Sequence, residues 1–231
     1  MPINNIILPG VPIDPTVDPL FANVILLLNM DGANGANTFA DSSSYNRTVS
    51  KVGSPTVDGA NGLVLNGSSA LSVPASADFL FPGDFCWELF ITNNSVSGTQ
   101  DLLNCGPMSF DGATTNKWSM LLSGAGLQTY PKNYNYGGFT SGMTVGVRRH
   151  VAAYRIGSIL YMAINGVVTA FPGIDIAGTI GNSASVVSIG GRLAASNFVN
   201  GIEGPVRITK GNARYGTANF TPPDFGPFQI K

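Results

Sequence analysis

Short apolar runs separated by turn-forming residues repeat along most of this chain. The run VILLL at 24–28 is continuous, as in a strand that is buried on both faces. The stretch DFCWELFI at 84–91 alternates instead, which is typical of a strand whose successive side chains point to opposite faces. Its two predicted faces consist of Phe85, Trp87 and Leu89, and of Cys86, Glu88 and Phe90.

The same pattern continues toward the C-terminus, with no convincing amphipathic helix between the runs. Asn66-Gly67 and Asn165-Gly166 each separate two apolar runs, and Asn-Gly is a strong signal for a β-hairpin turn. Many short strands without helical crossovers predict an all-β fold, an antiparallel two-sheet sandwich. Further predicted strands lie in KWSMLLSG, RRHVAAYRIG, SILYMAINGVVTAF and SVVSIGGR.

Residues 1–20 differ from the rest of the chain. They contain five prolines, which exclude a helix and favour an extended Pro-rich N-terminal arm. The arm also carries apolar residues, so we expect it to lie either on its own domain or on a neighbouring subunit. We therefore predict two parts, an extended arm at 1–20 and a single domain at 21–231.

Composition narrows the class of function. Charged residues make up 11% of the chain, against about 25% in typical soluble domains, and the formal net charge is -1. Such a chain has no basic field to attract nucleic acid or an anionic membrane, so neither is an expected partner. The start of the chain does not have the pattern of a signal peptide, and we expect Cys86 and Cys105 to be reduced and buried.

The stretch VRITKGNARY at 206–215 gathers three of the twelve basic residues. Its first half alternates, which predicts Val206 and Ile208 facing inward and Arg207 facing outward. Three cations in a nearly neutral protein make a poor phosphate track. We expect them instead to form salt bridges and hydrogen bonds that pin the chain end, with Tyr215 and Phe220 as apolar anchors.

The order of several segments resembles the concanavalin A-like, laminin-G-like domains of phage virion and tail-fibre proteins. The resemblance runs through DFCWELFI, KWSMLLSG, RRHVAAYRIGSILYMAINGVV and VSIGGR, and it is most specific in the closing segment FVNGIEGPVRITKGNARYGTANFTPP. It covers about residues 21–225. The resemblance implies a jelly-roll sandwich of two antiparallel sheets.

The resemblance also implies a calcium site at a sheet edge. The family commonly has two acidic residues before the closing strand, whereas this chain has only Glu203, followed by Gly204 and Pro205. Because the first and last strands are neighbours in the family fold, Glu203 could approach Asp31, with Asp41 nearby, as metal ligands. The alternative is that Asp31 and Asp41 form turns and cap backbone amides. Calcium is the single cofactor under consideration.

Enzymatic signatures are missing from the sequence. Glucanases that share this fold use acidic residues alternating along one strand, and retaining hydrolysis needs two carboxyls about 5–5.5 Å apart. The matching strand has only Glu88, and there is no G-x-S-x-G motif. We interpret His150, the sole histidine, as a structural residue. The prediction is a protein that is not an enzyme and has no catalytic residues.

The stretch LQTYPKNYNYGGF is the best ligand-binding candidate in the sequence. Carbohydrate sites need exposed aromatic rings with a few fixed polar groups, and this glycine-containing loop supplies both. Packing or a protein interface is the competing interpretation, because tyrosines also cover hydrophobic edges. The candidate residues are Tyr130, Tyr134, Tyr136 and Phe139.

These observations lead to two hypotheses of function. The first is a non-enzymatic bacteriophage virion protein, a capsid decoration or head-fibre subunit attached to coat subunits through its N-terminal arm and one domain face. It would be assembled in the host cytoplasm and would form a homo-oligomer on the particle. The second is a tail-fibre or tail-tip carbohydrate-binding module that recognises host glycan through the tyrosine-rich loop.

Overall fold

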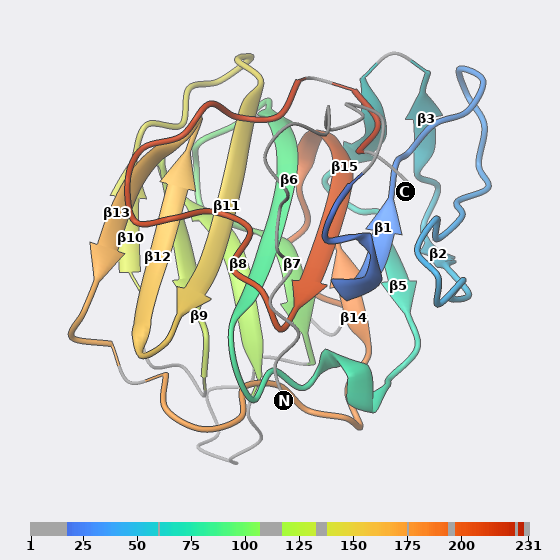
Figure 1. Ribbon diagram of the computed structural model, residues 1–231. Coiled ribbons are helices and arrows are strands. Elements are labelled where there is room, and N and C mark those ends of the chain that lie inside the picture. Colours follow the sequence, from blue (N-terminus) through green and yellow to red (C-terminus); the bar gives the residue numbers. More distant parts are fainter. Residues whose placement is uncertain are drawn as a thin grey trace, which may run out of the picture.

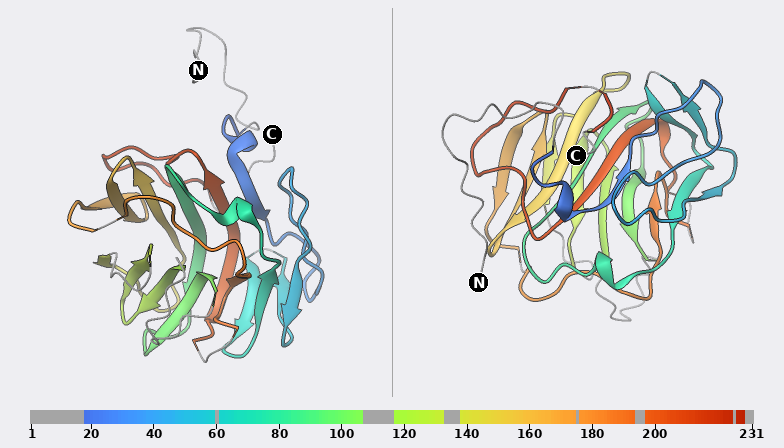
Figure 2. Two further views of the ribbon diagram at one scale, coloured as in Figure 1. Left: turned by 90° about the horizontal axis from the view of Figure 1, so that it is seen from below. Right: turned by 45° about the vertical axis from the view of Figure 1, so that its right-hand side comes forward.

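Two antiparallel β-sheets face each other across one hydrophobic core in the computed structural model (Figure 1). The structure describes residues 18–59, 61–106, 117–132, 138–174, 176–193, 197–224 and 226–228, and every structural statement below concerns these residues. Seen from below, the two sheets form the two layers of a sandwich (Figure 2). The predicted all-β jelly-roll sandwich is confirmed. The predicted arm falls almost entirely at 1–17, outside the described residues.

The front sheet, called sheet A, has eight strands within the described residues. Seven of them follow the order β13 (Val167–Phe171), β12 (Ile159–Ile164), β11 (Arg149–Ile156), β6 (Phe85–Asn93), β15 (Asn200–Lys210), β4 (Gly62–Asn66) and β3 (Thr56–Asp58), and the eighth is β1 (Val24–Leu28) beside β15. The rear sheet, called sheet B, follows the order β10 (Gly138–Ser141), β9 (Gly126–Tyr130), β8 (Trp118–Ser123), β7 (Thr99–Cys105), β14 (Val187–Ile189), β5 (Ala70–Val73) and β2 (Ser50–Val52).

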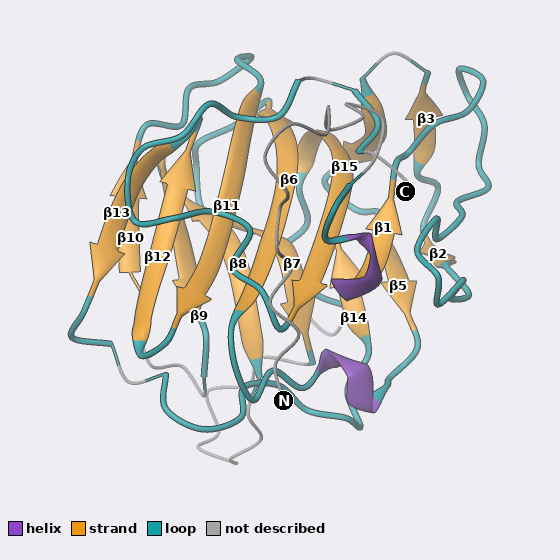
Figure 3. Ribbon diagram, viewed as in Figure 1, coloured by secondary structure: helices purple, strands orange, loops and turns teal. Residues whose placement is uncertain are grey.

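Helices are almost absent from the described residues. Two one-turn 3-10 helices, η1 (Phe21–Asn23) and η2 (Ala77–Phe79), are the only helical segments there (Figure 3). None of the helices in this part of the chain has the length and hydrophobicity needed to cross a bilayer.

Aromatic side chains join the two sheets at the centre of the core. The indoles of Trp87 on β6 and Trp118 on β8 stack with ring centroids 4.3 Å apart, and Phe85 stacks on the other side of Trp87. Glu88, by contrast, lies on the outer face of sheet A. The alternation along 84–91 therefore gives the two faces that the sequence predicts, because each strand residue points opposite to its neighbour.

The long strand β15 has two different partners on one edge. Its first half pairs with β4, and its second half pairs with β1. Between them the register with β6 shifts at Gly204 and Val206. Pro205 lies at this shift and has no backbone N–H to donate to a ladder, which accounts for the irregularity. The first and last strands are thus neighbours, as the family resemblance implies.

The two Asn-Gly turns behave differently. Asn165 and Gly166 join β12 to β13 in a tight hairpin, with φ values of 47° and 74° that match a two-residue primed turn. The hairpin predicted at Asn66-Gly67 is wrong. The strand before it, β4, belongs to sheet A, and the strand after it, β5, belongs to sheet B. The turn is tight, but each flanking strand finds its partners among distant strands.

A long segment without strands covers the outer face of sheet A. We call residues 211–224 and 226–228 the C-terminal strap. It crosses the front of the sheet in red in Figure 1. Tyr215 and Phe220 of the strap stack on each other at 3.8 Å and pack against Tyr154 and Tyr161 on the sheet. The prediction of two apolar anchors at the chain end is confirmed.

Candidate functional site

A buried cluster of charges lies between sheet A and the C-terminal strap. Glu88 on β6 is fully buried at its centre. On the neighbouring strand β15, Arg207 donates from Nε to Glu88 Oε1 at 2.8 Å. On β11, the Nε2 of His150 lies 3.0 Å from the other carboxylate oxygen. Because β11, β6 and β15 are neighbours in the sheet, these three outward-facing side chains lie next to one another.

The N-terminal end of the described chain completes this cluster. Asp18 accepts a hydrogen bond from Arg207 Nη1 at 3.2 Å and a further bond from Arg214 in the strap. Arg214 also donates from Nη1 to Thr209 at 3.1 Å. Tyr215 donates its hydroxyl to Glu88. The stretch at 206–215 therefore pins the chain end through salt bridges and hydrogen bonds, which confirms the sequence interpretation.

The surrounding charges decide the protonation of Glu88. Burial by itself would raise its pKa, but the charge of Arg207, together with His150 and Arg214, outweighs burial and lowers the pKa below its ordinary value. Burial and the nearby Glu88 raise the pKa of the Tyr215 hydroxyl, so it stays protonated and can donate. Glu88 is a fixed anion that holds the cluster together.

A pocket of about 580 Å³ opens beside this cluster. The N-terminal residues 18–20 form one wall, and residues 221–224 and 227–228 of the strap form another. Asp18, Arg207 and Arg214 supply polar groups, and Phe228 lies against Arg207 with its ring centroid 4.1 Å from the guanidinium carbon. The other apolar residues of the lining are Leu20, Tyr215 and four prolines, namely Pro19, Pro222, Pro223 and Pro227.

The predicted metal ligands occupy three different environments. Both carboxylate oxygens of Asp41 accept hydrogen bonds from backbone amides, among them those of Leu27 and Arg47. This is the capping role that the sequence offered as the alternative. Asp31 is exposed beside a smaller pocket. Within the described residues, no group of three His, Cys, Asp or Glu side chains could hold a metal ion.

Glu203 lies on the inner face of sheet A and is fully buried. It is paired in register with Ile91 and Leu63, both of which belong to the hydrophobic core. Neither carboxylate oxygen has a hydrogen-bond partner among the described residues. Burial therefore raises the pKa of Glu203 well above its ordinary value, which favours the neutral acid.

The tyrosine-rich loop is described only in part. Tyr134 and Tyr136 lie outside the described residues. Tyr130 on β9 accepts a hydrogen bond from Gln128 Nε2 at 3.1 Å and is half-buried. Phe139 on β10 is 42% exposed, and its ring occupies the space that a side chain at position 126 would need. The two rings project on the outer face of sheet B, from the edge strand β10 and from β9 beside it.

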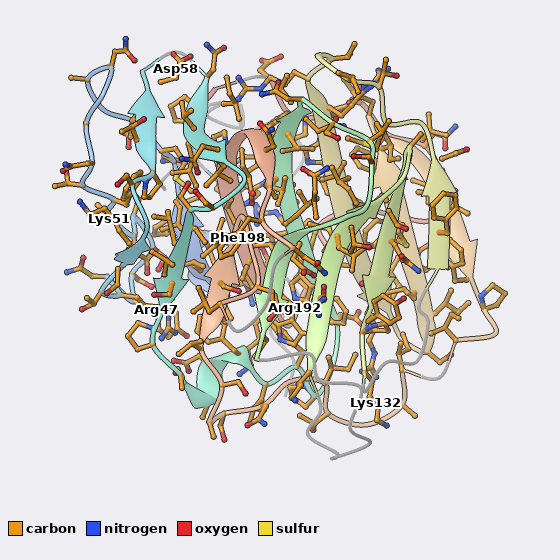
Figure 4. The ribbon with its side chains drawn as sticks, turned by 180° about the vertical axis from the view of Figure 1, so that it is seen from behind. Arg47, Lys51, Asp58, Lys132, Arg192 and Phe198 are labelled. Carbon is orange, nitrogen blue, oxygen red and sulfur yellow. The ribbon has the colours of Figure 1, made fainter. Side chains whose placement is uncertain are left out.

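The outer face of sheet B carries a second buried ion pair. Arg192 lies over the middle strands in Figure 4, which shows this face from behind. Its Nη2 is 3.0 Å from Asp101 on β7, and Ser119 on β8 donates to the same carboxylate at 3.1 Å. Burial raises the pKa of Asp101, although Arg192 opposes that shift. This pair fixes Arg192, which follows β14 in the chain, to the sheet.

Comparisons with known proteins identify the fold but no family. No protein-family model matches the chain, and no curated protein is similar to it. Domain 4 of AbnA, an extracellular GH43 arabinanase from Geobacillus stearothermophilus in complex with arabinotriose, superposes with a TM-score of 0.56 at 17% identity. That match covers 82% of this chain and 93% of the domain.

Receptor-binding domains of botulinum neurotoxins also superpose. A mosaic serotype C/D domain with tetraethylene glycol on its Hcn sub-domain gives a TM-score of 0.60 at 14% identity, covering 87% of this chain and 49% of that one. The type C toxin, whose cell entry depends on interaction with two ganglioside molecules, gives 0.58 at 13% identity over 87% and 49%. This chain thus spans about half the length of the neurotoxin domains. At these identities the likeness shows the fold alone.

The pocket was not predicted from the sequence, although the stretch at 206–215 contains two of its four charged lining residues, Arg207 and Arg214. Arg207 alternates with two core residues, and Glu88 is the only acid in an apolar strand. This pattern could have indicated an ion pair between two strands on the outer face of the sheet. Asp18 gave no such signal. Its role depends on where the N-terminal residues return to sheet A, and nothing in their local sequence specifies that place.

Proposed function

We propose that this protein is a non-catalytic carbohydrate-binding domain whose ligand occupies the pocket between residues 18–20 and the C-terminal strap. The observation that carries the proposal is the pocket's lining. Ion-paired Asp18, Arg207 and Arg214 offer both acceptors and donors next to the ring of Tyr215 and four prolines. Sugars need this combination, because each ring has hydroxyl edges and an apolar face.

The size of the pocket fits the same class of ligand. Ligand pockets typically enclose about 300–1,000 Å³, and this pocket of about 580 Å³ has room for a short oligosaccharide. Its charged side chains are held in place by Glu88 beneath them. A site whose polar groups are already fixed loses little conformational entropy when a ligand binds.

The protonation states argue against hydrolysis in this pocket. Glycoside hydrolysis needs a carboxylic acid of raised pKa facing a second carboxylate across the substrate. The pKa of Glu88, next to the pocket, is lowered by its cationic neighbours. The acid with a strongly raised pKa, Glu203, faces the core between the sheets and does not line the pocket. These two buried glutamates therefore do not form a matched acid and base in the pocket.

The structural neighbours support the proposal at the level of the fold. The arabinanase domain is in complex with arabinotriose, and the type C neurotoxin interacts with gangliosides. A sandwich of this shape is thus in complex with a saccharide in the arabinanase domain, whereas the match covers only 49% of the type C neurotoxin chain. The predicted aromatic patch at Tyr130 and Phe139 lies on the opposite sheet and provides the competing location for a sugar site.

A glycan array with two matched variants tests the proposal. Thr221 lines the pocket and Thr217 does not, and both are exposed residues of the strap. We expect Thr221→Trp to fill the pocket and abolish glycan binding, whereas Thr217→Trp retains it. If Phe139→Ala abolishes glycan binding and Thr221→Trp does not, the sugar site lies on sheet B. Turnover of any polysaccharide by the purified protein would overturn the non-catalytic assignment.

The finer assignment to a phage virion stays a prediction based on the closing segment. The named structural neighbours have no link to virions. Of the two virion hypotheses, the pocket supports the tail-fibre or tail-tip module that recognises host glycan. Capsid decoration would instead depend on the N-terminal arm. Binding to empty coat shells that is lost when residues 1–20 are deleted would support decoration, and imaging a C-terminally tagged protein on a virion would locate it.

A further inference from the structure

We propose that the pocket selects uncharged saccharides and rejects acidic ones. This inference rests on the proposed function and concerns the charge of the ligand. It follows from the way in which the charges of the pocket neutralise one another.

Each guanidinium at the pocket already has carboxylate partners. Arg207 contacts Glu88 through Nε at 2.8 Å and Asp18 through Nη1 at 3.2 Å. Arg214 contacts the same two carboxylates, with its Nε 3.3 Å from Glu88. Two cations and two anions therefore share one buried cluster. Among the described residues that line the pocket, the remaining charged side chain is Asp224, so the balance there is neutral to negative.

An acidic sugar would have to compete with carboxylates that cannot leave easily. Glu88 has no exposed surface and is covered by the strap, and Asp18 is 5% exposed. Displacing either one would leave a buried charge without its partner, which is strongly unfavourable. If both stay in place, an incoming carboxylate meets the negative charge of Asp224 and no uncompensated cation, so like charges oppose binding.

An uncharged sugar meets no such opposition. Its hydroxyls can donate to the carboxylates and accept from the guanidinium N–H groups without breaking the ion pairs. Its C–H face can lie on the half-buried Tyr215 or on the neighbouring prolines, which belong to the apolar part of the lining. Because no net charge is transferred into the pocket, we expect the affinity to depend little on salt concentration.

Matched pairs of oligosaccharides test this inference. Oligomers of glucose, galactose and mannose would be compared by calorimetry with the corresponding oligouronides, which differ by one carboxylate per sugar. For the sugar type that binds, we expect the neutral oligosaccharide to bind at least about tenfold more tightly than the corresponding oligouronide. We also expect Asp224→Lys to narrow that difference, because it replaces the negative charge at the pocket by a positive one.

The outcomes separate this inference from the proposed function. Equal or tighter binding of an oligouronide that is lost in Thr221→Trp would overturn the selectivity while leaving a carbohydrate site in the pocket. Binding that Thr221→Trp does not change would place the site elsewhere and overturn both. The Thr217→Trp variant serves as the folding and surface control in each measurement.

Discussion

Glu88 and Arg207 are direct cross-strand partners on β6 and β15, and their side chains meet at 2.8 Å although 119 positions separate them in the chain. This pair joins the centre of sheet A to its last strand. Through Asp18 and Arg214 it also holds both ends of the domain against the sheet. The stability of the fold and the shape of the pocket therefore depend on the same few side chains.

Removal of the central carboxylate charge should destabilise the protein strongly. Glu88→Gln keeps the side-chain size but leaves two buried guanidiniums short of one anion, and we expect a loss of about 3–5 kcal/mol in the free energy of unfolding. Urea unfolding monitored by tryptophan fluorescence would measure it. The exposed Lys51 provides the control, since Lys51→Gln should change stability by less than about 0.5 kcal/mol. An equally small effect at position 88 would contradict the structure.

The buried acid Glu203 should make stability fall as pH rises. Its folded-state pKa lies well above the ordinary 4.5, so its contribution is complete below that pH and is lost as pH rises toward the folded pKa. Glu203→Gln removes this titration, and the unfolding midpoint should decline less between pH 4.5 and about pH 8 than in the original protein.

The contribution of Glu88 to stability has the opposite dependence on pH, so it serves as an internal control for the Glu203 measurement. Its folded pKa is lowered, so its contribution is present above 4.5 and is lost as pH falls through the folded pKa. The loss of stability on the acid side should therefore persist in Glu203→Gln. Identical pH profiles for the original protein and Glu203→Gln would show that Glu203 is not held as a neutral acid.

Two glycines of similar conformation should respond differently to alanine. Gly157 and Gly166 lie in hairpin turns with φ of 59° and 74°, so both substitutions carry backbone strain of about 1–2 kcal/mol. A Cβ at Gly157 meets nothing within 4 Å, whereas one at Gly166 would lie 1.8 Å from the carbonyl oxygen of Phe220 in the strap. Gly166→Ala should therefore cost about 1–3 kcal/mol more in unfolding free energy.

The same substitution should loosen the strap. Limited proteolysis of Gly166→Ala should cut within residues 211–228 earlier than in Gly157→Ala, because the hydrogen bond from Phe220 to Gly166 is lost. Equal stability and equal cleavage of the two variants would indicate that the strap does not rest on the β12–β13 turn.

Both cysteines should be unreactive in the folded protein. Cys86 and Cys105 are free, and each side chain is fully buried. Burial raises the pKa of the Cys105 thiol to about 11 and that of Cys86 well above its ordinary value. A thiol-exchange reagent at about pH 8 should therefore react with both thiols only after denaturant is added. Rapid reaction of either thiol without denaturant would contradict the burial seen here.

The candidate site could be predicted from the sequence only in part. The outward position of Arg207 and the anchoring roles of Tyr215 and Phe220 follow from local alternation and apolar character, and both are confirmed. The joining of Asp18 to this group does not follow, because ion pairs between distant segments depend on how the chain returns. The virion assignment, the aromatic sugar site and the calcium site stay predictions.

Features that depend on neighbouring residues could be predicted from the sequence. Alternation along 84–91 predicts which side chains enter the core, and Asn165-Gly166 predicts a hairpin whose strands are neighbours in the chain. The sequence did not show that the strands beside Asn66-Gly67 belong to different sheets, because strand pairing depends on distant partners. The opposite pKa shifts of two buried acids could not be predicted from the sequence either. Glu88 is ionised among cations and Glu203 is neutral in an apolar core, since protonation follows the surroundings of a carboxyl group.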